Sequence, residues 1–316
     1  MDGSTPETLP QQRQQGLDVL SRAALQGHHK QAAYELGRLY SDRYLHEHNK
    51  DSSTALQWFH TALDLGEQRA LVDLAYGYYE GDNHDGKNDA QAFRFAKQGA
   101  DINDRYCQYV LGHLYLKGRG TSQNAIEAVK WLQCSADQGF AEAIEELAAV
   151  YLRGYGNVAK DYAKAYAICK RGLEYSLPFC QMTLADMYRH GWGTVRDYQQ
   201  AFNYYQLAAT HADPSPYAQH CLGEMFLNGE GVPQDVAVAE QWFTMASQQG
   251  YDPSNFKLQS LAKSKLSLQD LEVGMAPHSL VSTNIPPSPS TPTTPLSPTK
   301  SNRWSMNFFF QKKNVD

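Results

Sequence analysis

The feature that most constrains the fold is an internal repeat that occurs six times, with a period of 36 to 38 residues. Its first anchor is a leucine followed by glycine or alanine, with a small residue four positions before it and an aromatic residue four positions after it. The anchor leucines are Leu36, Leu74, Leu111, Leu147, Leu184 and Leu222. Since an α-helix turns by about 100° per residue, positions four apart share one face. Each anchor therefore predicts a helix with an apolar face, which we call helix A.

A second anchor predicts a second helix in each repeat, helix B. It begins with Asp or Asn, whose side-chain oxygens suit an N-cap because they accept hydrogen bonds from the free N–H groups of the first turn. The predicted N-caps are Asp51, Asn88, Asn124, Asp161, Asp197 and Asp235. Alanine follows four positions later, and a large residue three positions after that. These large residues are Trp58, Phe95, Trp131, Ile168, Tyr204 and Trp242.

Between the two helices, the last four repeats carry a Gly-x-Gly sequence. The pairs are Gly118/Gly120, Gly154/Gly156, Gly191/Gly193 and Gly229/Gly231. We expect a left-handed residue to end helix A here, because glycine adopts that conformation without a steric penalty. A phosphate-binding loop is disfavoured, since no strand is predicted before the pair and no third glycine follows at the required spacing.

These residues together resemble the Sel-1-like repeat family, a relative of the tetratricopeptide repeats. The family pattern has a small residue, Leu-Gly, Tyr and Gly-x-Gly in the first half, and Asp, Ala, Trp and Ala in the second. The segment from Leu222 to Gly250 matches it almost position by position, and the resemblance covers about residues 31–250. It implies an all-α, right-handed superhelical solenoid of about six helix pairs. Members of this family mostly act as adaptors within larger complexes.

The repeats predict the organisation of the chain. We expect a disordered N-terminus at 1–15, a capping half-repeat at 16–30 and six repeats at 31–251. A capping helix should follow at 252–273, because the apolar faces of terminal repeats must be covered. Residues 274–316 should form a disordered tail, since they are rich in Ser, Thr and Pro and poor in apolar residues.

The predicted tail carries four hydroxyl residues at a period of three, each followed by proline. These candidate phosphorylation sites for a proline-directed kinase are Ser288, Thr291, Thr294 and Ser297. Recognition by a proline-binding module and a linker without a reader remain alternatives.

The last segment places aromatic residues beside two lysines. The candidate tail motif consists of Trp304, Phe308, Phe309 and Phe310, with Ser305 as a further phosphorylation candidate. A linear motif for a partner, a weak contact with an anionic membrane surface and a contact with the chain's own helices all remain open.

The composition excludes several classes of function. A net charge of −6 and a pI of about 6.0 give no basis for expecting nucleic-acid binding, which needs clustered Lys and Arg. No apolar stretch is long enough for a transmembrane helix. The five cysteines show no metal-ligand spacing, and no hydrolase, zincin or Walker motif is present. We therefore expect no enzyme activity, metal or cofactor. Because the first residues do not resemble a signal peptide, we expect a cytoplasmic protein.

On helix A, positions −5, −2 and +2 relative to the leucine point away from the apolar face. They vary between repeats, as a surface that recognises a specific partner would. The candidate partner-binding residues are Tyr34, Arg38, Arg69, Tyr76, Tyr106, Tyr109, His113, Glu145, Phe179, Asp186, Tyr217 and Glu224. The alternative is that several of the aromatic residues pack against the neighbouring helix.

The sequence thus predicts a non-enzymatic scaffold that binds a peptide or helix of a partner protein on the inner surface of the solenoid. Phosphorylation of the tail would regulate this binding. The alternative function is that of a regulatory activator of a membrane-bound enzyme, like the chitin-synthase activators that share the repeat.

Overall fold

The structure, a computed structural model, describes residues 9–41, 51–80, 88–210 and 213–274, and their side chains from Gln14 to Lys265. Within these ranges the chain is almost entirely helical. The helices are α1 (Leu9–Leu25), α2 (Lys30–Tyr40), α3 (Ser52–Asp64), α4 (Ala70–Glu80), α5 (Asp89–Asp101), α6 (Arg105–Lys117), α7 (Ala125–Asp137), α8 (Ala141–Arg153), α9 (Tyr162–Gly172), the short 3-10 helix η1 (Leu173–Tyr175), α10 (Pro178–His190), α11 (Tyr198–Ala209), α12 (Pro216–Asn228), α13 (Val236–Gln248) and α14 (Asp252–Gly274).

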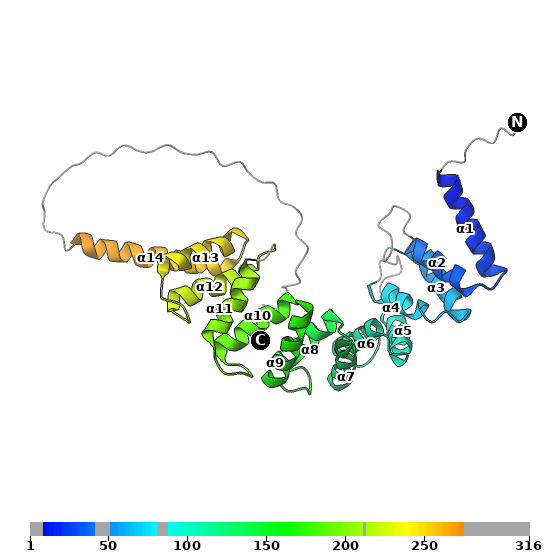
Figure 1. The fold of residues 1–316 in the computed structure, drawn as a ribbon, viewed down its shortest axis with the longest axis horizontal. Helices are drawn as coiled ribbons and strands as arrows, with labels where there is room; N and C mark the ends of the chain where they lie inside the picture. The colour runs from blue at the N-terminus through cyan, green and yellow to red at the C-terminus, as the bar shows by residue number, and fades with distance from the viewer. Residues whose placement is uncertain (1–8, 42–50, 81–87, 211–212, 275–316) are drawn as a thin grey trace, which may run out of the picture. The chain divides into compact units, whose positions relative to one another are not determined.

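Successive helices pack against one another in the order of the chain, as Figure 1 shows. The six predicted repeats are the pairs α2–α3, α4–α5, α6–α7, α8–α9, α10–α11 and α12–α13. The predicted class, an all-α solenoid of six helix pairs, is confirmed. By backbone contacts, one unit ends at Ser264, inside α14, and contains all of these pairs. The second unit is described only from Lys265 to Gly274, the last turns of that helix.

Every predicted N-cap residue caps its helix B. The Oδ1 atom of Asp51, for example, accepts hydrogen bonds from the backbone N–H groups of Ser53 and Thr54 at 3.1 Å. Hydrogen bonds from Thr54 are the main cause that lowers the pKa of Asp51 to about 2. The other caps are Asn88, Asn124, Asp161, Asp197 and Asp235.

Helix A ends at the predicted left-handed glycine in three of the four Gly-x-Gly turns, at Gly118, Gly191 and Gly229. Gly154 has a positive φ angle of 72° but a ψ angle of 152°, so it lies outside the left-handed helical region. The second glycine of these turns has a further role. Gly118 and Gly120 have φ angles of 66° and 67°. A Cβ atom on Gly120 would lie 2.1 Å from the backbone oxygen of Asp89, at the start of the preceding helix B. In the same way, a Cβ atom on Gly193 would lie 2.2 Å from the backbone oxygen of Tyr162. The second glycine therefore lets the turn touch the preceding repeat.

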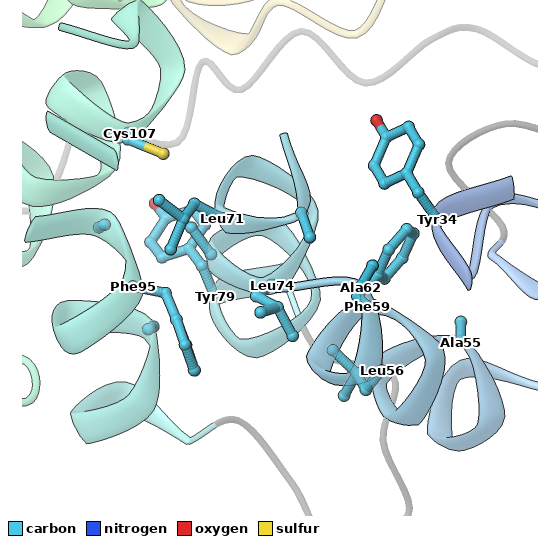
Figure 2. Close-up of a cluster of buried hydrophobic side chains, with 14 of the residues drawn as sticks. Tyr34, Ala55, Leu56, Phe59, Ala62, Leu71, Leu74, Tyr79, Phe95 and Cys107 are labelled. Carbon is cyan, nitrogen blue, oxygen red and sulfur yellow. The ribbon is translucent and has the colours of Figure 1, made fainter. Parts of the chain in front are cut away.

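The core depends on close approach of the helices at small residues. A Cβ atom on Gly37 of α2 would lie 2.5 Å from the Phe59 ring of α3, and one on Gly112 of α6 would lie 2.8 Å from Cγ of Leu132 of α7. Figure 2 shows buried side chains of three successive helices, including Phe59 of α3, Leu74 of α4 and Phe95 of α5.

The repeated large residues of helix B are buried to different degrees. Phe95 and Ile168 are buried, but Trp58, Trp131, Tyr204 and Trp242 are half-buried. The residues that follow these four are the fully buried ones, namely Phe59, Leu132, Tyr205 and Phe243. One residue further along the helix turns the side chain by about 100°, from the edge of the interface towards helix A.

The ends of the solenoid differ partly from the prediction. Helix α1 begins at Leu9, so residues 9–15 are helical rather than disordered. Pro10 lies in its first turn, where a missing N–H group is tolerated. Helix α14 begins at Asp252, the predicted start of the capping helix, and contacts α12 through a 2.9 Å hydrogen bond between Ser254 Oγ and His220 Nδ1.

The remaining predictions for the termini lie outside the described residues. These are the disordered segment at 1–8, the tail at 275–316, its phosphorylation candidates Ser288, Thr291, Thr294, Ser297 and Ser305, and its motif of Trp304, Phe308, Phe309 and Phe310.

Replacing Gly112 with alanine tests the close approach of α6 and α7. The added Cβ atom would overlap Leu132, and overpacking of this kind costs about 1–3 kcal/mol of stability. The gain in helix propensity is smaller, about 0.5–1 kcal/mol. We expect denaturant unfolding to show a net loss for Gly112→Ala.

Gly16→Ala is the matched control, because nothing lies within 4 Å of a Cβ atom at Gly16 in α1. That variant should be as stable as the wild type or slightly more so. Equal stability of the two variants would contradict the packing that we describe.

Candidate protein-binding face

The predicted partner-binding residues lie on the helix A elements, or immediately before one in the case of Arg69. We call their surface the helix A face. They were predicted to point away from the apolar face of helix A, with packing against the neighbouring helix as the alternative for several aromatic residues. In the structure Arg69 is exposed, Tyr34 is buried and the others are half-buried. The reason is that helix A of one repeat contacts helix A of the next, as α4 contacts α6, and covers part of its face.

At the first junction, the predicted residues hold two repeats together. The Tyr34 hydroxyl donates a 3.0 Å hydrogen bond to Asp73, and the Arg69 guanidinium lies 4.6 Å from the centre of the Tyr34 ring. Arg69 also donates to Gln31 at 2.6 Å and to Glu67 at 2.8 Å. Tyr34 is therefore a structural residue. Arg38 pairs with Glu35 on its own helix at 3.0 Å.

In the middle of the solenoid, the predicted residues form a continuous group of rings. We call Tyr76, Tyr106, Tyr109, His113 and Phe140 the central aromatic cluster. The ring of Tyr106 lies 6.1 Å from that of Tyr76 and 6.0 Å from that of Phe140, and Tyr109 lies 5.2 Å from Phe140. All five residues are half-buried, so each of them leaves part of its surface accessible.

Two residues that support this cluster escaped the sequence analysis. Phe140 occupies the N-cap position of α8, where no side-chain capping bond forms. Glu146, next to Leu147, binds His113 Nδ1 at 2.8 Å. The sequence did contain a signal for Phe140, namely an aromatic residue at a position where a capping residue is expected. Burial raises the pKa of the Tyr109 hydroxyl well above its ordinary value, so this hydroxyl stays neutral.

At the last junctions, the predicted residues are again structural. Asp186 accepts hydrogen bonds from the hydroxyls of Tyr205 and Tyr217, the latter at 2.8 Å. Burial raises the pKa of Asp186, and these two hydrogen bonds partly offset that effect. Glu224 accepts from the buried Arg189 at 3.0 Å and pairs with Lys257 of α14 at 3.2 Å.

Glu145 of α8 differs from these carboxylates. Burial, and then the charge of Glu142, raises its pKa to about 7. Among the described residues it has no hydrogen-bond or ion-pair partner. The charge of Glu145 is one cause that raises the pKa of the Cys180 thiol in α10. Phe179, the residue before Cys180, is half-buried. Glu145 is thus a partly desolvated acid on the helix A face that lacks a cation.

The predicted partner-binding residues therefore fall into two groups. The structure brings together Tyr76, Tyr106, Tyr109 and His113, with Glu145 on the following helix A. It assigns Tyr34, Asp186, Tyr217 and Glu224 to contacts between repeats. In the part of the chain that the structure describes, no three His, Cys, Asp or Glu side chains gather in a way that could hold a metal ion. None of the described helices combines the length and apolar character needed to cross a membrane.

Comparisons with known proteins agree with this architecture. The family model described as "Sel1 repeat" matches residues 30–67, 68–104, 105–140, 141–172, 178–213 and 216–251. The structure of a protective antigen of uropathogenic Escherichia coli with an SLR fold superimposes with a TM-score of 0.67. It has 28% sequence identity and covers 79% of this chain and 52% of that one.

Two curated relatives are regulators from yeasts. Chitin synthase regulatory factor 2 of Schizosaccharomyces pombe is 29% identical over 130 residues, which are 40% of this chain and 25% of the relative. Chitin synthase regulator SKT5 of Saccharomyces cerevisiae is 26% identical over 200 residues, 63% of this chain and 24% of the relative. The chain thus spans about a quarter of the length of each.

The environment of Glu145 predicts a dependence of stability on pH. Its pKa is about 7 in the fold and 4.5 ordinarily, so the protonated form stabilises the fold. This contribution is complete below pH 4.5 and is lost as the pH rises through 7. Because the side chain is partly solvated, we expect a contribution of about 1–2 kcal/mol.

Denaturant unfolding of the wild type and Glu145→Gln at about pH 5 and pH 8 measures this contribution. Glu145→Gln should gain stability relative to the wild type as the pH rises, whereas Glu174→Gln, at an exposed position in η1, should not. A constant difference between Glu145→Gln and the wild type would show that Glu145 is ordinarily solvated.

Proposed function

The chain belongs to the Sel1 repeat family, and from this we propose that it is a protein-binding adaptor whose helix A face recognises a peptide or helix of a partner protein. Sel1 repeats generally form scaffolds for protein interactions rather than catalytic sites. The proposal concerns which surface binds and what chemistry the partner brings.

The proposal rests on the central aromatic cluster together with the unpaired Glu145 on the following helix A. Half-buried aromatic side chains in fixed positions can contribute much of the energy of an interface, because they bury a large area with little loss of conformational entropy. The rings of the cluster hold one another in place, as the 5.2 Å contact of Tyr109 with Phe140 illustrates. A partner segment that extended from the cluster along the helix A face to Glu145 would desolvate this carboxylate further, which favours Lys or Arg at that point of the partner.

The geometry around Glu145 suits ion pairing better than acid–base catalysis. A general acid needs to act with a second group and a bound substrate at hydrogen-bonding distance. No such second group lies within that distance of Glu145 among the described residues. A peptide with apolar side chains for the cluster and a cation for Glu145 satisfies both features of the face.

The yeast relatives support a second candidate function. Two of them are regulators of chitin synthase, and they match 130 and 200 residues of this chain. On that basis the partner would be a membrane-bound enzyme that this chain regulates. The aromatic and basic end of the sequence, with Trp304 and Phe308, would then provide a contact with the membrane surface.

We further propose that the adaptor acts in the cytoplasm and is regulated through its C-terminal segment. The Ser-Pro and Thr-Pro sites from Ser288 to Ser297 are spaced for proline-directed phosphorylation. Phosphate groups add negative charge, which would weaken the attraction of the Lys312–Lys313 end for an anionic surface. A kinase or a proline-binding module would be the partner of this segment.

Affinity capture with the full-length chain, from soluble and detergent-extracted membrane fractions of the source cells, tests the adaptor function. The decisive variant is Glu145→Gln, because it keeps the shape of the side chain and removes only its charge. Loss of a charge-assisted hydrogen bond costs about 1.5–3 kcal/mol, so recovery of the partner should fall about tenfold or more. Tyr76→Ala should reduce recovery of the same proteins.

Glu174→Gln in η1 is the matched control and should leave recovery unchanged, because this exposed residue lies away from the helix A face. Glu145→Gln should not be less stable than the wild type, so unfolding would not explain a loss of binding. Undiminished recovery with both Glu145→Gln and Tyr76→Ala would contradict the proposal. A membrane-bound enzyme recovered from the membrane fraction, and lost with these variants, would favour the second candidate.

A further inference from the structure

We propose that a hollow between α7 and the loop that precedes α9 is a second docking site, which accepts one apolar side chain of a partner protein flanked by a carboxylate. The hollow has a volume of about 260 Å³. Ile126, Val129, Tyr151 and Val158 form its apolar lining, and Lys160 and Lys164 contribute its positive charge. None of these residues belongs to the helix A face, so failure of either proposal leaves the other intact.

The hollow exists where the loop of one repeat is longer than its counterparts. The segment from the first glycine of the turn to the N-cap of helix B contains seven residues in Gly118–Asn124, Gly191–Asp197 and Gly229–Asp235, but eight in Gly154–Asp161. The extra residue forms a small turn, closed by two 2.9 Å hydrogen bonds between the backbones of Tyr155 and Val158. This turn brings Val158 to the hollow.

The backbone at the end of α8 shows the same difference. Gly154 has a ψ angle of 152°, whereas Gly118 and Gly191, its counterparts in two other repeats, have ψ angles of 34° and 31°. The chain therefore leaves α8 in a different direction. The insertion and the changed exit direction set this turn apart from the other described Gly-x-Gly turns.

A second, independent difference from the other repeats lies on α7, which also lines the hollow. Ile126 stands two positions after the N-cap of α7 and is 59% exposed. The corresponding residues of the other repeats are small or polar, namely Ser53, Ala90, Ala163, Gln199 and Ala237. One exposed isoleucine is ordinary on a protein surface, but this one continues the apolar lining made by Val129 and Val158.

The size of the hollow indicates what fits it. Pockets for cofactors and drug-sized ligands usually measure about 300–1,000 Å³, with most of the ligand enclosed. At about 260 Å³, this hollow is smaller and suits a single aromatic or branched aliphatic side chain. Apolar walls on both sides favour such a side chain over a polar one.

The charges at the hollow indicate which kind of partner residue would lie next to the apolar side chain. Asp161 accepts the 2.9 Å N-cap hydrogen bond from Lys164 and also pairs with the Lys164 ammonium at 3.4 Å. Lys160 is exposed and has no ion-pair partner among the described residues. The lining therefore has an excess positive charge on a chain whose net charge is −6. A carboxylate next to the apolar side chain is the complementary neighbour.

This preference is opposite to that of the helix A face. Glu142 and Glu145 favour a partner segment with Lys or Arg, whereas Lys160 favours one with Asp or Glu. Two sites with opposite charge preferences would let the solenoid hold two different segments without competition between them.

NMR of the full chain with labelled Ile and Val methyl groups tests the second site. The probes are two short blocked peptides, Gly-Phe-Glu-Gly and Gly-Phe-Lys-Gly. The Glu peptide at millimolar concentration should shift the methyl signals of Ile126, Val129 and Val158. The Lys peptide should bind about 1.4- to 5-fold more weakly, because an exposed ion pair contributes about 0.2–1 kcal/mol.

Three variants sharpen the test. Ile126→Ser introduces the residue found at the equivalent position of the first repeat, and it should remove the shifts of Val129 and Val158. Lys160→Glu should reverse the preference between the two peptides. Val195→Ser is the matched control, because Val195 lies in another Gly-x-Gly loop and is 85% exposed; it should change nothing.

Several outcomes would overturn the proposal. These are an absence of methyl shifts at millimolar peptide, equal shifts with the two peptides, and unchanged binding by Ile126→Ser. Shifts of the same methyl groups that depend on protein concentration without any peptide would assign the hollow to a second copy of the chain instead.

Discussion

Close packing of helices at small residues is the constraint on which the rest of the structure depends. Glycines in helix A, such as Gly112, touch the core side chains of helix B in the same repeat. Glycines in helix B touch helix A of the next repeat, where a Cβ atom on Gly172 would lie 2.4 Å from the Cys180 thiol. These contacts act within and between repeats, so one pattern of small residues sets both the pairing of helices and the stacking of pairs.

The close packing of neighbouring repeats determines which polar side chains are used in contacts between repeats and which remain accessible to a partner. Where neighbouring repeats supply complementary groups, as in Tyr34 with Asp73 or Tyr217 with Asp186, the side chains are used for cohesion. In the middle of the array, the rings around Tyr109 pack on one another but remain half-buried, and Glu145 receives no cation from its neighbours. The face that we propose for a partner therefore consists of side chains that the contacts between repeats leave partly accessible.

The sequence predicted what depends on local chemistry within a repeat. The N-caps such as Asp51 and the left-handed glycines such as Gly118 follow from the preferences of single residues, and they are present. The burial of Phe59 instead of Trp58 depends on the angle at which two helices meet. The hydrogen bond that Asp186 accepts from Tyr217 depends on which side chains the next repeat places beside it. The long loop after Gly154 was visible in the sequence, but the hollow also needs Ile126 on a separate helix.

We propose that the helix A face, around the central aromatic cluster, contacts the partner. Site-specific photo-crosslinking in cells tests it most directly, with a photoreactive residue at Tyr76 or Phe179 on helix A elements and at Lys97 or Lys170 on helix B elements. Our account predicts crosslinks to the same partner protein from Tyr76 and Phe179, and none to it from Lys97 and Lys170. Crosslinks to that partner from Lys97 and Lys170 alone would contradict it.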